Sequence, residues 1–298
     1  MAIPLITVCI CTFKRPAFLE HLLRKLESQR TDNLFEYDVV VADNDETRSA
    51  EPVVASCASS SNLKITYCVE PVANIARARN TAVAQARGDL IAFIDDDEFP
   101  TEEWLYSLFR TREAHRAGGV LGPVLPHFQQ EPPAWLTKGR FFDRPRYPTG
   151  RPIAWFEARS GNVLFVREIL EQLDPPFRTQ FATAGEDMDF FRRAIERGFS
   201  FVWCDEAEVF EFVPASRCTR RYLLRRAVLR GSNFPKHPTD RAKNAVKSLV
   251  ALPCYTVALP VLAIVGHHVF ITYLIKVLDH ASRLLAFAGL PLLSERET

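Results

Sequence analysis

The chain carries the sequence DLIAFIDDDE from Asp89 to Glu98, in which an apolar segment runs directly into four consecutive acids. Residues 89–94 have the length and composition of a buried strand bounded by polar residues. Open α/β sheets bind their ligands beyond the carboxyl ends of such strands. We therefore expect an α/β fold with a mainly parallel sheet, in which these acids stand at the carboxyl edge.

On both sides of this segment, apolar runs alternate with helical patterns, as in βαβ units. We expect further strands at 5–11, 37–43, 63–69 and 161–166. Helices are expected from Pro16, at 74–87 with Gly88 as the stop, from Thr101 as the cap, and at 185–197. Residues 126–152 contain six prolines, which favours a long functional loop.

The acids at 95–98 suit a divalent cation. Carboxylates at positions i and i+2, such as Asp95 and Asp97, can converge on one ion, and Mg²⁺ or Mn²⁺ prefers oxygen ligands while leaving positions for phosphate. A solvated acidic turn is the alternative. Because the acids follow the apolar IAFI without a break, we favour the cation site.

Three other acids have two interpretations each. Asp43 ends the strand at 37–43, where it can bind a base or a ribose, or cap the next turn. Glu186 and Asp187 open a helix, where the dipole favours a carboxylate that can act as a general base. Both could equally serve as helix caps.

The last third of the chain combines positive charge with apolar residues. Between Arg217 and Lys247 there are ten basic residues and one acid, and residues 248–275 carry no formal charge. An uncharged segment of this length can span a bilayer, which takes roughly 20 residues. A spanning, re-entrant or interfacial element is expected, and a buried core helix is the alternative. The adjacent basic block would contact anionic lipid or phosphate.

Composition narrows the class of protein. Hydrophobic residues make up 47% and charged residues 24% of the chain, which excludes a disordered protein. The seven cysteines form no CxxC pair, and their odd number favours a reducing compartment. From Met1 the chain enters a strand without a basic leader or cleavage site, so we expect no signal peptide.

Six motifs, taken in order, resemble those of family 2 glycosyltransferases. They are CTFKRP (11–16), VVADND (40–45), NIARARN (74–80), AFIDDDE (92–98), GNVLF (161–165) and GEDMDFFRR (185–193). The resemblance implies a GT-A fold with a catalytic domain at 1–231, divided into a nucleotide-sugar half at 1–125 and an acceptor half at 126–231. A membrane-associated region would follow at 232–298. The residues of several of these motifs are similar to those of glucosyltransferases of succinoglycan-type exopolysaccharide synthesis.

The resemblance also implies roles for individual residues. Asp187 would be the catalytic base, supported by Glu186. Asp97 and Asp95 would hold the metal. The predicted contacts with the nucleotide sugar come from Thr12, Asp43, Arg79, Asp95, Asp96, Arg226 and Arg230. A lipid-facing basic surface is the alternative for the two last arginines. Many members of this family have a histidine that can touch the metal where this chain has Phe210, whose side chain has no metal-binding atom.

The expected function is an inverting glycosyltransferase that uses Mg²⁺ or Mn²⁺. It would move a hexose, glucose from UDP-glucose, onto a hydroxyl of a lipid-linked or surface-polysaccharide acceptor. Its expected partners are the UDP-sugar, that acceptor and a membrane surface, at the cytoplasmic face of the bacterial inner membrane, and no nucleic acid. The alternatives are a nucleotidyltransferase, although CTFKRP lacks the glycines of a phosphate loop, and an inactive membrane scaffold of the same fold.

Overall fold

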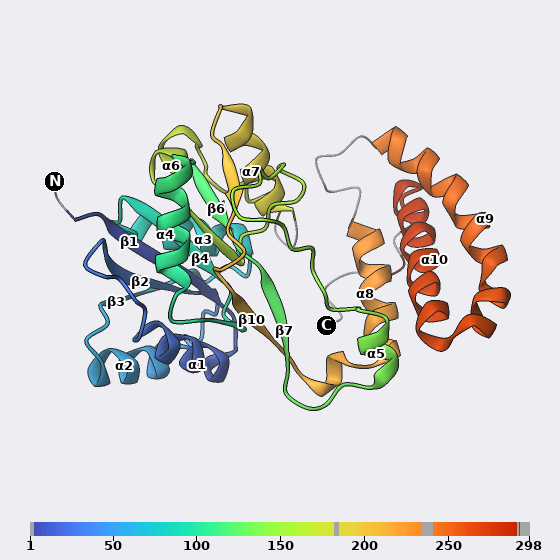
Figure 1. Ribbon diagram of the computed structural model, residues 1–298, viewed down its shortest axis with the longest axis horizontal. Coiled ribbons are helices and arrows are strands. Elements are labelled where there is room, and N and C mark those ends of the chain that lie inside the picture. Colours follow the sequence, from blue (N-terminus) through green and yellow to red (C-terminus); the bar gives the residue numbers. More distant parts are fainter. Residues whose placement is uncertain (1–2, 182–184, 234–240, 291, 293–298) are drawn as a thin grey trace. The chain divides into compact units, whose positions relative to one another are not determined.

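The computed structural model of the chain describes residues 3–181, 185–233, 241–290 and 292 (Figure 1). The chain forms two compact units. The first unit contains Met1–Leu125 and Arg144–Glu211, and the second contains Pro126–Asp143 and Phe212–Thr298. The predicted domain boundaries at 125 and 231 stay a prediction.

A seven-stranded sheet forms the centre of the first unit, in the order β3-β2-β1-β4-β8-β6-β9. The strands that pair with a parallel neighbour are β1 (Leu5–Thr12), β2 (Glu36–Asp43), β3 (Ile65–Val69), β4 (Leu90–Ile94), β6 (Gly119–Leu121) and β9 (Phe201–Trp203). The strand β8 (Asn162–Val166) runs antiparallel to both of its neighbours, β4 and β6. The sheet is therefore mainly parallel.

Helices cover both faces of this sheet because successive residues of a strand point to opposite sides. Ile6, Val8 and Ile10 of β1 belong to one buried cluster and Cys9 belongs to the other. The first cluster is completed by α1 (Pro16–Leu26), α2 (Glu51–Ser60) and α4 (Trp104–His115). The second is completed by α3 (Ile75–Gln85), α6 (Glu168–Gln172) and α7 (Glu186–Glu196).

Two predicted helix boundaries are wrong. The helix α3 ends at Gln85, before the extended residue Ala86. A Cβ at Gly88 would lie 2.5 Å from the backbone nitrogen of Thr7, so this glycine permits close packing against β1 and does not stop the helix. The helix α4 begins only at Trp104, and no side chain caps it, so Thr101 is not its cap.

Three further strands form a small second sheet in the order β5-β10-β7. They are β5 (Glu98–Pro100), β10 (Val209–Val213) and β7 (Val124–Phe128), and β5 starts at the last of the four acids. The chain passes from the first unit to the second along β7 and β10. The predicted loop at 126–152 contains the end of β7 and the short helix α5 (Ala134–Lys138).

The second unit consists mainly of helices. After the 3₁₀ turn η1 (Ala215–Arg217) come α8 (Arg220–Asn233), α9 (Arg241–Val265) and α10 (His267–Phe287), and α10 lies between the other two (Figure 1). The uncharged segment 248–275 is therefore divided between two helices at Gly266. Among the described residues, one helix is long and apolar enough to cross a membrane, at Ala242–Val265, and an 18-residue stretch of it has a mean hydropathy of 2.1.

Candidate active site

Three predicted site residues end neighbouring parallel strands of the first unit. Thr12 ends β1 and faces Asp43 at the end of β2, while Asp95 follows β4, which pairs with β1 on its other side. Parallel strands place their carboxyl ends along one edge of the sheet. The topology thus brings together residues that are far apart in the sequence, at the edge where α/β sheets bind ligands.

Asp96 and Asp97 are held by residues at the end of β1. The Thr12 hydroxyl donates to Asp96 Oδ2 over 2.8 Å, and Arg15 Nη1 donates to Asp96 Oδ1 over 3.0 Å and to Asp97 Oδ2 over 3.1 Å. The side chains of Asp96 and Asp97 are only 7% and 12% exposed. Arg15 belongs to the motif CTFKRP, but sequence reasoning gave it no role.

Burial raises the pKa of Asp96 to about 6, although Arg15 and the Thr12 hydrogen bond act to lower it. The folded, metal-free protein therefore retains a proton that the unfolded chain releases between about pH 4 and pH 6. The Asp96 contribution to the free energy of unfolding then falls as the pH rises through this window.

We predict that Asp96→Asn removes this dependence. Between pH 4 and pH 7 the free energy of unfolding of the wild type should fall by about 3 kcal/mol relative to the variant, because the pKa of Asp96 is about 6 in the folded protein and about 4 in the unfolded chain. Urea unfolding of both proteins in EDTA would measure it, and the wild type should lose stability relative to the variant as the pH rises. A difference that stays constant from pH 4 to pH 7 would contradict the assignment.

Asp95 and Glu98 lie against the backbone of Gly161. A Cβ on this glycine would come within 2.9 Å of Glu98 Oε1 and 3.0 Å of Asp95 Oδ2. Glu98 is buried, and its Oε2 accepts from the Asp95 backbone nitrogen over 3.2 Å. Burial raises the pKa of Glu98, and the charge of Asp95 raises it further. Sequence reasoning placed Gly161 in a strand motif and missed that its missing side chain makes room for two carboxylates.

We predict that Gly161→Ala displaces these carboxylates. Overpacking of this kind destabilises a protein by roughly 1–3 kcal/mol, and cation-dependent nucleotide binding should weaken by about tenfold or more. Isothermal titration with UDP and Mn²⁺ would measure the binding. The control is Gly118→Ala, whose Cβ would approach the Phe199 side chain at 3.2 Å. Equal nucleotide affinity in the two variants would refute this role for Gly161.

Arg79 connects the acids after β4 with the start of α7. Its Nη1 donates to Glu186 Oε1, and its Nη2 lies 3.8 Å from Asp95 Oδ1. The guanidinium is buried beside the rings of Phe93 and Phe177, 6.0 Å and 5.7 Å from their centroids. Burial acts to lower the pKa of Arg79, but the nearby carboxylates outweigh it and the pKa is raised. Arg79 is therefore a fixed positive charge between two acidic groups.

Glu186 and Asp187 stand at the N-terminus of α7, behind Gly185 in the left-handed conformation with φ of 97°. Glu186 is buried, and its Oε2 has no hydrogen-bond partner among the described residues. Burial raises the pKa of Glu186, against the effect of Arg79. Asp187 is half-buried, and its Oδ1 accepts from the Met188 backbone nitrogen over 2.7 Å. Asp187 is thus the more accessible carboxylate of the pair.

Asp43 is fully buried and already accepts three hydrogen bonds. The donors are the backbone nitrogens of Asp45 and Ala50, at 3.1 Å and 2.9 Å, and the Tyr67 hydroxyl at 2.8 Å. The carboxylate therefore orders the loop that follows β2. Its predicted contact with the nucleoside stays a prediction.

The predicted arginines of the diphosphate site lie on α8, in the second unit. Arg230 Nε donates to Asp279 Oδ1 of α10 over 2.8 Å, and Arg226 lies one turn earlier. Their contact with a diphosphate stays a prediction. Phe210, where the resemblance led to comparison with a histidine, lies on β10 and stacks on Phe99 with centroids 5.5 Å apart. Its ring belongs to aromatic packing and supplies no metal ligand.

The carboxylates fit a divalent cation that also binds phosphate. Across the described residues, no three His, Cys, Asp or Glu side chains already converge as a metal centre. Mg²⁺ commonly takes one or two protein carboxylates and completes its shell with water and substrate phosphates. The two carboxylates suited to bind the cation are those of Asp95, whose side chain is 50% exposed, and Asp97.

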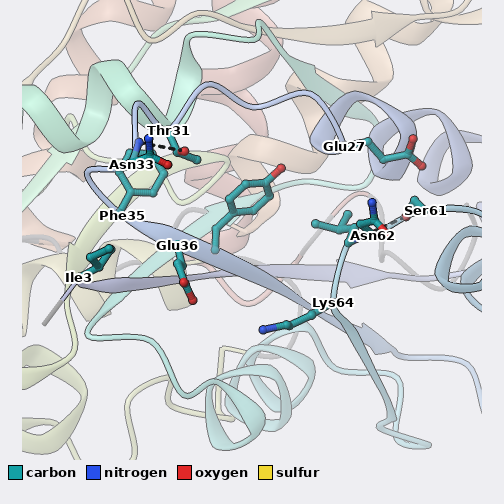
Figure 2. A pocket seen from close by; sticks show the side chains of 11 residues that line it. Ile3, Glu27, Thr31, Asn33, Phe35, Glu36, Ser61, Asn62 and Lys64 are labelled. Carbon is teal, nitrogen blue, oxygen red and sulfur yellow. Dashed lines mark hydrogen bonds between the residues drawn. The ribbon is translucent and has the colours of Figure 1, made fainter.

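A pocket of about 590 Å³ lies elsewhere, at the opposite edge of the sheet (Figure 2). Its lining includes Ile3 before β1, Glu36 at the start of β2 and Lys64 before β3. These are the amino ends of parallel strands. The pocket is therefore separate from the site at the carboxyl edge, whose acids it does not contain.

Comparisons with known proteins agree with this architecture. Residues 7–174 match the family model described as Glycosyl transferase family 2. The chain is 32% identical over 242 residues to the succinoglycan biosynthesis protein ExoM of Rhizobium meliloti (strain 1021), covering 80% of this chain and 76% of that protein. It is 27% identical over 115 residues to the poly(ribitol-phosphate) beta-N-acetylglucosaminyltransferase TarS of Staphylococcus aureus (strain Mu50 / ATCC 700699), covering 39% of this chain and 20% of TarS.

Solved structures are similar in fold. The crystal structure of S. aureus TarS 1–349 has a TM-score of 0.54 at 19% identity, covering 81% of this chain and 68% of that chain. The TarS complex with UDP-GlcNAc has the same TM-score at 18% identity, covering 81% and 70%. The predicted α/β fold with its mainly parallel sheet is confirmed. The family match, together with the ExoM relative, means that the chain is a glycosyltransferase and belongs to glycosyl transferase family 2.

Proposed function

We propose that the chain is an inverting glycosyltransferase that moves glucose from UDP-glucose onto a hydroxyl of a lipid-linked or surface-polysaccharide acceptor. The observation that carries this proposal is the buried Arg79, which binds Glu186 and lies 3.8 Å from Asp95. This arginine joins the acids after β4 to the N-terminus of α7. A donor-binding group and a general base are thereby kept within one site.

The donor would lie along the carboxyl edge of the sheet. In this proposal Thr12 and Asp43 position the nucleoside, Asp96 lies toward the ribose, and Arg79 lies near the base or phosphates. Asp97 and Asp95 would hold Mg²⁺ or Mn²⁺, which when bound supplies positive charge to the phosphate oxygens. Arg226 and Arg230 would bind the diphosphate, for which the planar guanidinium is suited.

Asp187 would accept the proton of the acceptor hydroxyl. The hydroxyl oxygen forms a bond to the anomeric carbon while the bond from that carbon to the diphosphate oxygen breaks, and the electron pair leaves with the nucleoside diphosphate. An α-linked donor then gives a β-linked product in one step. Two features support this role: Asp187 is accessible, and the α7 dipole favours a carboxylate at this position. Glu186 would hold the helix start in place through Arg79.

The acceptor would be presented by a membrane. ExoM is named for succinoglycan biosynthesis and TarS for transfer to poly(ribitol-phosphate), so both relatives are named for polymers. Lys243 and Lys247 near the N-terminus of α9, together with the apolar residues that follow them, support attachment to an anionic membrane surface. We place the protein at the cytoplasmic face of the inner membrane because the anionic lipids of that leaflet attract basic residues beside an apolar segment.

A panel of nucleotide sugars with and without Mn²⁺ tests this function. UDP-glucose, UDP-galactose, UDP-GlcNAc and GDP-mannose would each be incubated with the full chain and a lipid extract, and the released nucleoside diphosphate would be measured. We expect release from UDP-glucose in the presence of Mn²⁺, and much less with EDTA. Preferred turnover of another donor would overturn the proposed sugar, and no release from any donor would overturn the activity.

A further inference from the structure

The helix α9 has one apolar face that the structure leaves uncovered. Six of its exposed large side chains are Leu249, Val250, Val257, Val261, Ile264 and Val265, which are between 61% and 88% exposed. The opposite face packs against α10, where Ser248 Oγ lies 3.0 Å from His280 Nδ1 and Tyr255 packs edge-on against Tyr273. At 3.6 residues per turn the exposed positions of residues 249–265 cover about 200° of the helix surface.

This face fits a lipid surface better than a second protein helix. A helix that packs on another helix commonly presents an apolar stripe of about 100°, whereas the exposed arc here is about twice as wide. No acidic residue occurs in α9, and Lys243 and Lys247 stand near its N-terminus. Basic residues beside an apolar face attract anionic lipid.

The neighbouring helices do not permit α9 to cross the bilayer as part of this unit. On its far side from α9, α10 packs against α8, which carries five arginines. The two ends of α8 lie along α10, because Arg230 binds Asp279 while Arg220 lies over Trp135, whose ring meets His267. A spanning α9 would therefore take the arginines of α8 to the same depth. The transfer of an arginine side chain to the bilayer centre is energetically unfavourable.

The polar residues of α10 point to the same conclusion. Asp279 binds both Arg230 and Arg283, each over 2.8 Å, and Lys276 lies over the Tyr255 and Tyr273 rings. These groups pack beside the part of α9 that runs from Ser248 to Tyr255, since His280 contacts Ser248 and Lys276 lies over the Tyr255 ring. They would have to enter the hydrocarbon beside a spanning α9.

We infer that α9 lies in the plane of the membrane as a one-sided anchor, with its exposed apolar face in the lipid of a single leaflet and α10 shielding the other face. Such helices bury their apolar face about 5–10 Å into the boundary between the headgroups and the acyl chains. This inference rests on the proposed membrane attachment and specifies its form. The catalytic unit would then remain on the side of the membrane from which α9 inserts.

Depth measurements at three positions of the full chain test this arrangement. Cys254 is the one exposed cysteine among the described residues, so Cys254→Ser provides a background for the cysteine substitutions. Leu249→Cys, Val257→Cys and Ile264→Cys would be labelled with an environment-sensitive dye and mixed with phosphatidylcholine and phosphatidylglycerol vesicles. Nitroxides at shallow and deep chain positions then report the depth. Ser59→Cys on α2 is the control that should show no quenching.

An in-plane helix predicts equal, shallow depths at all three positions, although residues 249 and 264 are about 22 Å apart along the helix. A deep residue 257 between shallow ends, with residue 264 protected from external dithionite, would mean that α9 spans and would overturn the inference. Bound protein without quenching, with cysteine crosslinks between copies, would assign this face to a second copy and also overturn it.

A matched pair of charge substitutions provides an independent measurement. Ile264 and Ile3 are both exposed, at 88% and 54%, but only Ile264 lies on α9. Ile264→Glu should weaken vesicle flotation by about tenfold or more, because an apolar contact is lost and a negative charge meets anionic lipid. Ile3→Glu should leave flotation unchanged. Equal flotation of both variants would contradict the lipid contact.

The same preparation distinguishes the two proposals. If the wild type does not float with vesicles but releases UDP from UDP-glucose, the membrane attachment and the in-plane helix fail while the proposed reaction stands. If the protein floats with vesicles and the three labelled positions have equal depths, but it neither hydrolyses a nucleotide sugar nor transfers its sugar, the proposed reaction fails and the in-plane helix stands.

Discussion

Asp187→Asn should lower turnover by on the order of 10³-fold and leave the affinity for UDP within about twofold of the wild type. An amide has nearly the shape of a carboxylate but cannot accept the proton of the acceptor hydroxyl. A base acts in the transition state, so its loss reduces kcat more than it reduces ground-state binding. Steady-state kinetics and calorimetric titration with UDP would measure the two quantities.

Glu196→Gln is the matched control for this variant. Glu196 ends the same helix, α7, and its side chain is 57% exposed in an ion pair with Arg192. The substitution makes the same change from acid to amide and should leave turnover within about twofold, since exposed pairs contribute little. If Asp187→Asn kept near-normal turnover, Asp187 would not be the base.

Asp97→Ala should weaken UDP binding by on the order of 100-fold when Mn²⁺ is present and by only a few-fold in EDTA. The side chain is nearly buried, and Arg15 fixes its Oδ2 at 3.1 Å. A carboxylate held in this way is preorganised to bind a cation. Its removal should therefore lower the affinity for UDP mainly when the cation contributes to that affinity. Equal losses with and without Mn²⁺ would mean that Asp97 has a structural role.

Arg15→Met separates these two roles of Asp97. Methionine retains an apolar side chain of similar length but does not donate to Asp96 and Asp97. If Arg15 orients the carboxylate for a cation, this variant should also lose affinity for UDP with Mn²⁺, by about tenfold. The same titrations measure it, and addition of more Mn²⁺ should partly restore binding. Unchanged affinity would show that the Asp97 orientation does not depend on Arg15.

The long apolar strands could be predicted from the sequence because each is buried on both faces. The strands β1, β2 and β4 therefore appear as continuous apolar runs. By contrast, β5, β6 and β9 have three residues each, too few for a periodic pattern, and their pairing comes from distant partners. Sequence reasoning missed them for this reason.

The predictions that Gly88 stops one helix and Thr101 caps another are wrong because tertiary packing determines the roles of both residues. Gly88 is small because β1 passes close to it, which the sequence does not disclose. Thr101 precedes α4 by three residues and uses its carbonyl to accept from Gln29 and Trp104. Both residue types occur at helix ends and in close-packed turns, and the distinction depends on what lies nearby.

In the site, the acids could be predicted but their partners could not. A run of acids after a strand is visible in any sequence, whereas the ion pair between Arg79 and Glu186 joins residues 107 positions apart. The same limit applies to Gly161, whose role is defined by Asp95 and Glu98. The C-terminal segment was expected as one uncharged element, and the structure divides it at Gly266 into helices with different environments.

The configuration of the transferred sugar tests most directly the claim that Asp187 promotes a single displacement. UDP-glucose with its α-linked glucose would be incubated with the full chain, Mn²⁺ and lipid-linked acceptors, and the new glycosidic bond would be analysed by proton NMR coupling at the anomeric position. We predict a β-linked glucose, formed by the wild type and lost in Asp187→Asn. An α-linked product would require retention of configuration and would contradict the mechanism.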